Sequence, residues 1–417
     1  MKLDLMATEL GLESSLPYLR HGWADSQRNM SRPVPGFLDE QFVTEAVRGV
    51  NLPEETVQEA CEVARLVAGN PALCALAWHC HWCLYHVHGF SGHVADQWPA
   101  LEHLGQDTNR YFYLLVLLSN YPQMQEIHDR HALSEEVRDL TLEQILRRGR
   151  HCGAHLGGWG LDGHAARWLA NTLRGDIYAI GRLVYEFRCF PAPFRVYRHE
   201  RSRAVIMLCE AGLRFGADGQ RVHGPGDDHP WTSRLAETLT EIVGHPVTPE
   251  GAAMRQEITL PTAEWRLLLQ REDPVLSVHI PGGSPLDLDR CAKSFRDATV
   301  FFPRYFPDRP FSAFRCASWL LDTQLEDWLP PTANLVRFLR EWYLLPGGIG
   351  AGPLLEAVFG GRPPDLAKAP RDTALQRAVL DHLSSGRPIR PRAGHGVIFP
   401  EDLDRGRQVY RGLRPHS

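Results

Sequence analysis

Apolar residues recur every three or four positions through about the first 150 residues, which is the spacing of one buried helix face. Three segments have the pattern clearly: a run that has Pro53 at its first helical position and acids in its first turn and that stops at Gly69-Asn70, a second run that Pro71 opens, and residues 106–118. Thr141 followed by Gln144 has the spacing of a capping box, so we expect a helix to begin there. The first part of the chain is therefore predicted to be all-α.

The pattern changes to strand-like alternation in the second half of the chain. Residues 181–187 alternate between apolar and polar, and two short runs at 194–199 and 205–209 flank turn residues, as in a hairpin. Residues 232–243 have a helix-like pattern, and a β-branched apolar run follows at 275–280. Strands interrupted by helices predict a mixed β-sheet flanked by helices, which is an α+β layer architecture.

A glycine-rich segment, residues 151–163, separates the two patterns. We therefore place the domain boundary near it and predict a helical N-terminal domain of residues 1–160 and a sheet domain of residues 161–417. The length of 417 residues and the hydrophobic share of 43% agree with this division, because they provide enough apolar material for two packed cores.

Charge and hydropathy exclude some classes of partner. The formal net charge of −5 gives no basic field, so nucleic acid is not an expected partner. No apolar run approaches the roughly 20 residues of a membrane-spanning helix. Acidic residues interrupt the first 16 residues, so no signal peptide is expected and the location is predicted to be cytoplasmic. Nine cysteines, an odd number, lie mostly in apolar segments and are predicted to be buried thiols.

One segment of the helical half carries metal-ligand residue types at helical separations. His79, Cys83 and His86 would approach one helix face, where they could bind zinc or a similar metal. Structural zinc sites normally draw ligands from two separated pairs, and no second pair with that spacing occurs in the sequence. Cysteine is also a common core residue. We therefore predict core packing here and no metal.

A histidine stands at the end of the apolar run 275–280. His279 precedes a Pro-Gly-Gly turn, and Asp287 or Asp289 can cap the helix that follows. Exposed backbone N–H groups and the positive end of a helix dipole gather at such a junction, which suits an anionic ligand such as a pyrophosphate. Because imidazole titrates close to neutral pH, His279 is our candidate general base.

Three separated strings carry a family resemblance: HIPGGSPLD (residues 279–287), SWLLDTQLEDWLPPTANLVRFLREWYL (residues 318–344) and APRDTALQRAVLDHLSSG (residues 369–386). They resemble the bacterial acyltransferase family that has a helical N-terminal domain and a GNAT-like C-terminal domain. The resemblance implies a GNAT fold and N-acyl transfer from a thioester, either acyl-CoA or the phosphopantetheine of an acyl carrier protein. The implied acceptor is an amine of a metabolite or peptide.

The resemblance also implies roles for particular residues. The segment 278–280 corresponds to the fourth GNAT strand and the segment 314–320 to the fifth; in this family the two strands splay and leave a backbone N–H for the thioester oxygen. His279 is then the catalytic base, and Ser318 and Tyr343 are candidate acids for the leaving thiolate. The expected donor-binding residues are Val278, Ile280, Gly282, Gly283 and Ser284.

A second class of function stays open at this point. The chain could keep the GNAT scaffold as a catalytically weak or inactive protein that binds acyl thioesters and regulates other processes, because a fold does not fix a function. A hydrolase with a serine or cysteine nucleophile is less favoured, since the sequence has no G-x-S-x-G nucleophile elbow.

Overall fold

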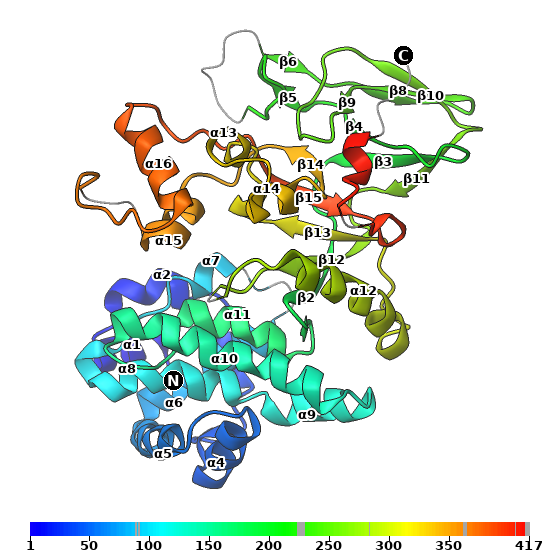
Figure 1. Cartoon of the computed structure of the whole chain (residues 1–417). Helices are drawn as coiled ribbons and strands as arrows, with labels where there is room; N and C mark the ends of the chain where they lie inside the picture. Colours follow the sequence, from blue (N-terminus) through cyan, green and yellow to red (C-terminus); the bar gives the residue numbers. More distant parts are fainter. Residues whose placement is uncertain are drawn as a thin grey trace. The chain divides into compact units, whose positions relative to one another are not determined.

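The computed structural model describes residues 1–87, 90, 92–222, 230–282, 284–361, 365–404 and 406–412 (Figure 1). The chain divides into two compact units, Met1–Ile180 and Gly181–Ser417. The division follows Ile180, whereas the sequence places the boundary near residue 160. The reason is that α11 (Gly163–Leu173) packs against α8 (Gln106–Leu118) and α10 (Glu135–Leu156) of the first unit.

The first unit is helical apart from one short strand. Besides α8, α10 and α11 it contains α1 (Leu3–Leu10), η1 (Glu13–Ser15), α2 (Leu16–Leu19), α3 (Trp23–Arg28), η2 (Gly36–Leu38), α4 (Glu40–Gly49), α5 (Glu54–Ala68), α6 (Pro71–Tyr85), α7 (Gly92–Ala95), η3 (Glu102–Leu104), α9 (Tyr121–Arg130) and β1 (Ile177–Ile180).

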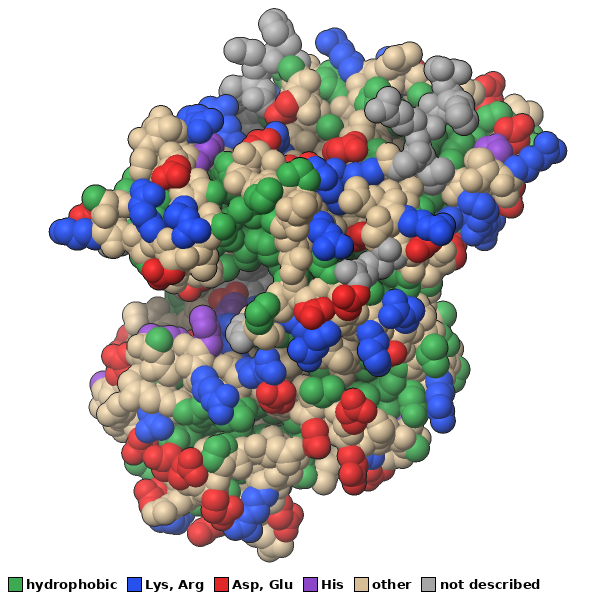
Figure 2. Space-filling view, in the orientation of Figure 1, with side chains coloured by type: hydrophobic (Ala, Val, Ile, Leu, Met, Phe, Trp, Pro, Cys, Tyr) green, Lys and Arg blue, Asp and Glu red, His purple; other side chains and the backbone are tan. Residues whose placement is uncertain are grey.

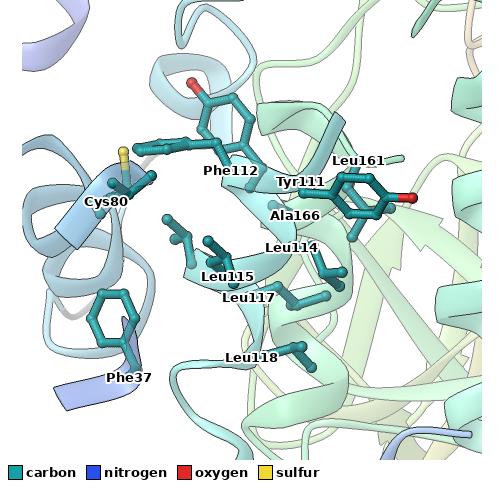
Figure 3. Packing of buried hydrophobic residues seen from close by; sticks show 14 of the residues in the cluster. Phe37, Cys80, Tyr111, Phe112, Leu114, Leu115, Leu117, Leu118, Leu161 and Ala166 are labelled. Carbon is teal, nitrogen blue, oxygen red and sulfur yellow. The ribbon is translucent and has the colours of Figure 1, made fainter. Parts of the chain in front are cut away.

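Helix α8 forms the centre of this unit. Every residue from Tyr111 to Leu118 is buried, so the helix is apolar all round, as a helix surrounded by others must be. Its side chains lie between Cys80 of α6 on one side and Leu161 and Ala166 on the other (Figure 3). The predicted helix 106–118 and the start of α6 at Pro71 are confirmed. The helix predicted to begin at Pro53 begins at Glu54, with Pro53 as its N-cap residue.

The predicted start of a helix at Thr141 is wrong. Helix α10 begins at Glu135, and Ser134 caps it by accepting a hydrogen bond from the Val137 N–H. Thr141 is a buried interior residue whose Oγ1 accepts a hydrogen bond from the Ala179 N–H at 3.0 Å. A capping motif and an interior threonine have the same sequence pattern, and here the threonine connects α10 with β1.

The second unit is built on a mixed central sheet. Its strands follow the order β2 (Leu183–Cys189), β12 (Pro274–His279), β13 (Ala313–Ala317), β15 (Ala393–Ile398) and β14 (Tyr343–Pro346). Strands β12 and β13 run parallel, and the other neighbours in this series are antiparallel. The predicted strand at 275–280 is thus confirmed, and its helix α12 (Leu288–Tyr305) follows as expected.

Shorter strands form three additional sheets in this unit. They are β11 (Trp265–Leu269) with β3 (Phe194–His199), β4 (Val205–Cys209) and β9 (Pro246–Val247); β10 (Ile258–Pro261) with β8 (Glu241–Gly244) and β7 (Leu235–Glu237); and β5 (Arg214–Phe215) with β6 (Trp231–Thr232). The remaining helices are η4 (Trp319–Leu321), α13 (Leu325–Trp328), α14 (Asn334–Leu339), α15 (Gly352–Phe359), α16 (Ala374–Ser384), η5 (Pro400–Asp402) and α17 (Val409–Gly412).

The helix predicted at 232–243 is wrong, because these residues form strands β7 and β8 and the turn between them. The Thr238 hydroxyl accepts hydrogen bonds from the Thr240 and Glu241 N–H groups, which fixes the turn. Ile242 is then buried beside Leu260 of β10. Contact with a second strand overrides the local helical pattern.

The two faces of the central sheet have different coverings. Helix α12 packs its Phe295 and Phe302 against Tyr185 and Phe314, which share one face. On the opposite face the Tyr343 hydroxyl donates to the Val247 carbonyl at 2.5 Å, which brings β14 against the sheet of β3, β4, β9 and β11. Both the all-α first unit and the mixed sheet flanked by helices agree with the predicted α+β fold class.

Acidic and basic side chains are intermingled over the face of the molecule in Figure 2. Among the described residues, no single helix is long and apolar enough to cross a membrane, although α5 and α6 together, bent by 113°, have the required length and composition. All nine cysteines are free thiols; eight are buried as predicted, and Cys189 is exposed.

We expect Phe112→Ala to destabilise the helical unit by about 3–5 kcal/mol, because a fully buried ring would leave a cavity. Urea unfolding followed by circular dichroism measures the change. Leu66→Ala is the matched control, since this leucine of α5 is 47% exposed. Equal unfolding midpoints for the two variants would contradict the central position of α8.

Candidate active site

The pairing of the parallel strands β12 and β13 stops one residue before their carboxyl ends. It extends from Val275–Ala313 to Val278–Cys316. Beyond that point β12 continues to pair with β2 as far as His279, while β13 pairs with β15 as far as Ala317. We call the unpaired point between His279 and Ala317 the opening; Ala317, on its β13 side, is exposed to solvent.

His279 lies at this opening and is paired with a buried carboxylate. Its Nε2 is 3.1 Å from Oε2 of Glu186 on β2, and its side chain is 30% exposed against 4% for Glu186. Arg188 donates to the other carboxylate oxygen of Glu186, at 2.6 Å. Although burial favours the neutral acid, the hydrogen bonds from His279 and Arg188 outweigh it and lower the pKa of Glu186.

This pairing defines the state of the imidazole. A carboxylate only accepts hydrogen bonds, so the Nε2–H of His279 donates to Glu186; in the neutral imidazole the lone pair then lies on Nδ1. That tautomer is the one a general base needs. The ring is also held in one orientation by a partner on the neighbouring strand, which is the arrangement that supports proton transfer.

The turn after β12 is held by side chains from other elements. Arg182 is buried, and its guanidinium donates to the Ser284 carbonyl at 3.2 Å. Asn334 donates to the Leu286 carbonyl at 3.0 Å. Asp287 caps α12 by accepting from the Arg290 N–H, so it takes the role that the sequence leaves open between Asp287 and Asp289.

Of the five expected donor-binding residues, four can be placed. Val278 is buried in β12, and Ile280 directly follows the strand. Gly282 and Ser284 are exposed in the turn, whereas Gly283 lies outside the described residues. The N-terminal end of α12 lies three residues beyond Pro285, so backbone N–H groups and the helix dipole are available next to the turn.

Neither candidate acid is hydrogen-bonded to His279 among the described residues. Ser318 caps η4, and its hydroxyl accepts from the Leu320 N–H at 3.2 Å. Tyr343 is fully buried in β14, where its hydroxyl also accepts from the Met207 N–H at 3.3 Å. Burial raises the pKa of Tyr343, which makes its proton harder to release. The structure does not bring either hydroxyl into contact with His279.

Sequence reasoning misses Glu186, Arg315 and His395, three polar residues that share the sheet face of His279. Glu186 pairs across the sheet with Ser277, Ser277 with Arg315, and Ala317 with His395, and residues two apart on a strand point to the same side. The one available signal is that Glu186 and Arg315 are charged residues inside strongly apolar strands. Which of them meet depends on strand register, which a single sequence does not reveal.

The three metal-ligand types singled out in the helical unit take different partners. His79 Nδ1 lies 3.0 Å from the Ser26 hydroxyl, and its Nε2 is 3.6 Å from the Cys83 sulfur. His86 instead lies against His81, with 3.2 Å between their Nε2 atoms. His79 and Cys83 are buried core residues, as expected.

Comparison with known protein families identifies the class. Residues 177–397 match the family described as GNAT-like C-terminal domain, and residues 41–175 match the N-acyltransferase N-terminal domain. The chain belongs to the family that combines these two domains, and the protein is an acyltransferase. No curated protein matches the chain.

Solved acyltransferase structures have the same fold. One, in complex with decanoyl-CoA and teicoplanin, aligns with a TM-score of 0.63 and 22% identity over 96% of this chain and 99% of its own. Another, a mutant in complex with octanoyl-CoA, aligns with a TM-score of 0.63 and 21% identity over the same shares. The chain is therefore similar to these proteins along nearly its whole length.

His395 provides a prediction about pH. Burial, together with the charges of Arg315 and Arg221, lowers the pKa of its imidazole from 6.5 to about 4. The unfolded chain takes up this proton below pH 6.5 while the folded protein does not, so stability falls as the pH falls from 6.5 toward 4. His395→Gln should make that fall smaller, as measured by urea midpoints at several pH values.

The matched control is His151→Gln, because His151 is exposed. Some loss of stability at low pH remains in His395→Gln, since burial also lowers the pKa values of His79 and His128 to about 4. An unaltered pH dependence in His395→Gln would contradict the prediction.

Proposed function

We propose that the protein is an N-acyltransferase that moves an acyl group from an acyl-CoA thioester to an amine of a metabolite or peptide. The observation that carries the proposal is the opening between the ends of β12 and β13, with the His279–Glu186 pair at its edge and the turn to α12 directly beyond it. An acyl carrier protein would present the same pantetheine thioester, so it is the alternative donor.

Acyl transfer to an amine requires a base, because an ammonium group has no lone pair with which to attack the thioester. The Nδ1 of His279 removes the proton, and Glu186 stabilises the imidazolium that forms. The amine nitrogen then attacks the thioester carbon and carries a second proton into the intermediate. The carbon–sulfur bond breaks, this second proton passes to the departing thiolate to give a thiol, and His279 later releases the first proton to solvent. We leave Tyr343 out of this scheme because its hydroxyl donates to the Val247 carbonyl. Ser318 stays a candidate acid, since its hydroxyl accepts from the Leu320 N–H and keeps its own proton.

The donor fits the other side of the same opening. Val278 and Ile280 provide backbone around the separating strand, where an N–H directed at the thioester oxygen would stabilise the negative charge of the intermediate. Gly282 and Ser284 border the N-terminal end of α12, a suitable environment for pyrophosphate oxygens. The similar solved structures, which contain octanoyl-CoA or decanoyl-CoA, support CoA as the carrier.

The structures in complex with teicoplanin or 10C-teicoplanin support an amine-bearing acceptor of the peptide class. Thiol release from octanoyl-CoA and decanoyl-CoA with a panel of amines tests the function. We expect release that depends on the amine. Binding of these donors without release for any amine would contradict an acyl-transfer activity and favour a thioester-binding role.

His279→Ala should lower kcat about 10²–10⁴-fold and leave the affinity for CoA largely unchanged, because the base acts in the chemical step alone. The matched control is His199→Ala in the same unit, since His199 also pairs with a carboxylate, Glu264, at 3.3 Å. Equal kcat values for the two variants would remove His279 from the mechanism.

Glu186→Gln should lower kcat while leaving KM for the donor nearly unchanged. Glutamine retains the shape of the side chain but has no charge to stabilise the imidazolium of His279. Glu186→Asp should recover part of the activity because the charge returns. If Glu186→Gln retained full kcat, Glu186 would be a structural residue only.

A further inference from the structure

A cavity of about 220 Å³ lies over the sheet face that carries Glu186 and His279, on the side opposite α12. Arg315 of β13 and His395 of β15 line it from the sheet, Arg221 lines it from the loop after β5, and Phe190 and Leu345 contribute apolar walls. Its volume corresponds to about seven water molecules. The cavity can therefore hold a small polar group.

Two arginines line this cavity, and no carboxylate stands among its described lining residues. Within the part of the chain that the structure describes, neither Arg315 nor Arg221 lies within 4.0 Å of an acidic oxygen. Arg315 makes one long hydrogen bond, 3.5 Å to the Ser277 hydroxyl, and the Nε of Arg221 is buried with no hydrogen-bond partner. The carboxylate of Glu186 is already bound by His279 and Arg188.

Two other arginines of low exposure in this unit contact carboxylates, whereas the buried Arg182 donates to main-chain carbonyls. Arg198, 2% exposed, makes two hydrogen bonds to the Asp402 carboxylate at 2.8 and 2.7 Å. Arg411, 13% exposed, pairs with Glu326 at 2.9 Å. Withdrawing a charge from water is unfavourable unless an opposite charge compensates it. No carboxylate stands among the described residues that line the cavity, so an anion bound there would compensate the two arginines.

We infer that this cavity is a binding subsite for a carboxylate of the acceptor, so that the acceptor is an amine that also carries a carboxylate, as an amino acid or a peptide C-terminus does. The inference rests on the proposed function. Paired guanidinium groups match a planar carboxylate through parallel hydrogen bonds. The small volume and the apolar walls also favour one compact anionic group.

The position on the sheet supports the acceptor rather than the donor. Arg315 pairs with Ser277, and His279 lies two residues further along β12 on the same face, so the backbone positions of Arg315 and His279 are roughly 8 Å apart by ordinary strand geometry. Helix α12 packs on the other face. A carboxylate held by Arg315 would thus direct a nearby amine of the same molecule along the face toward His279.

Isothermal titration with N-acetylglycine and its neutral twin N-acetylglycinamide tests the inference on the full chain. The first should bind and the second should bind at least 10-fold more weakly. Arg315→Gln and Arg221→Gln should each weaken N-acetylglycine binding at least 10-fold, and Arg315→Lys should recover part of it. The matched control is Arg214→Gln, because Arg214 is exposed on the adjoining strand β5.

Titration with coenzyme A distinguishes a carboxylate of the acceptor from a phosphate of the donor as the anion that the cavity binds. The arginine variants should bind coenzyme A as the wild type does. Equal binding of the two glycine derivatives, or unchanged binding in both arginine variants, would overturn the inference, and so would a selective loss of coenzyme A binding, since that would assign the cavity to a donor phosphate. Because these titrations need no turnover, a failure of the proposed reaction would be seen separately, as absent thiol release.

Discussion

The structure depends on a buried carboxylate at the end of a pair of parallel strands. Strands β12 and β13 pair over four residues, and where this pairing stops the Glu186 carboxylate holds His279 from the strand on the other side. A carboxylate that is 4% exposed stays charged only because His279 and Arg188 donate to it. The opening and the oriented imidazole therefore arise from the same stretch of sheet.

The rest of the second unit maintains this geometry. The aromatic side chains of α12 cover one face of the sheet and leave the other face for polar residues. Arg182 and Asn334 hold the turn that leads from β12 into α12, so the end of the strand and the start of the helix keep a fixed relation. On the polar face, Glu186, Ser277 and Arg315 lie side by side on three neighbouring strands, and Arg315 lines the cavity.

The sequence predicts those parts of this arrangement that lie close together along the chain. The strand at 275–280, its histidine, the glycine turn and the capped helix are contiguous, and each has a local signal. Cross-strand register places Glu186, Arg315 and His395 on the same sheet face as His279, and no local sequence pattern reveals this register. The same limit explains residues 232–243, where pairing with β10 makes strands of a segment with a helical pattern.

In the proposed mechanism the thioester lies between the ends of β12 and β13, on the sheet face of His279. A crystal structure with a thioether analogue of decanoyl-CoA measures this directly. We predict the sulfur atom beside Val278, with the imidazole of His279 facing the adjacent acyl carbon and the pyrophosphate at the N-terminal end of α12. A pantetheine arm on the α12 side of the sheet, or away from the opening, would contradict the account.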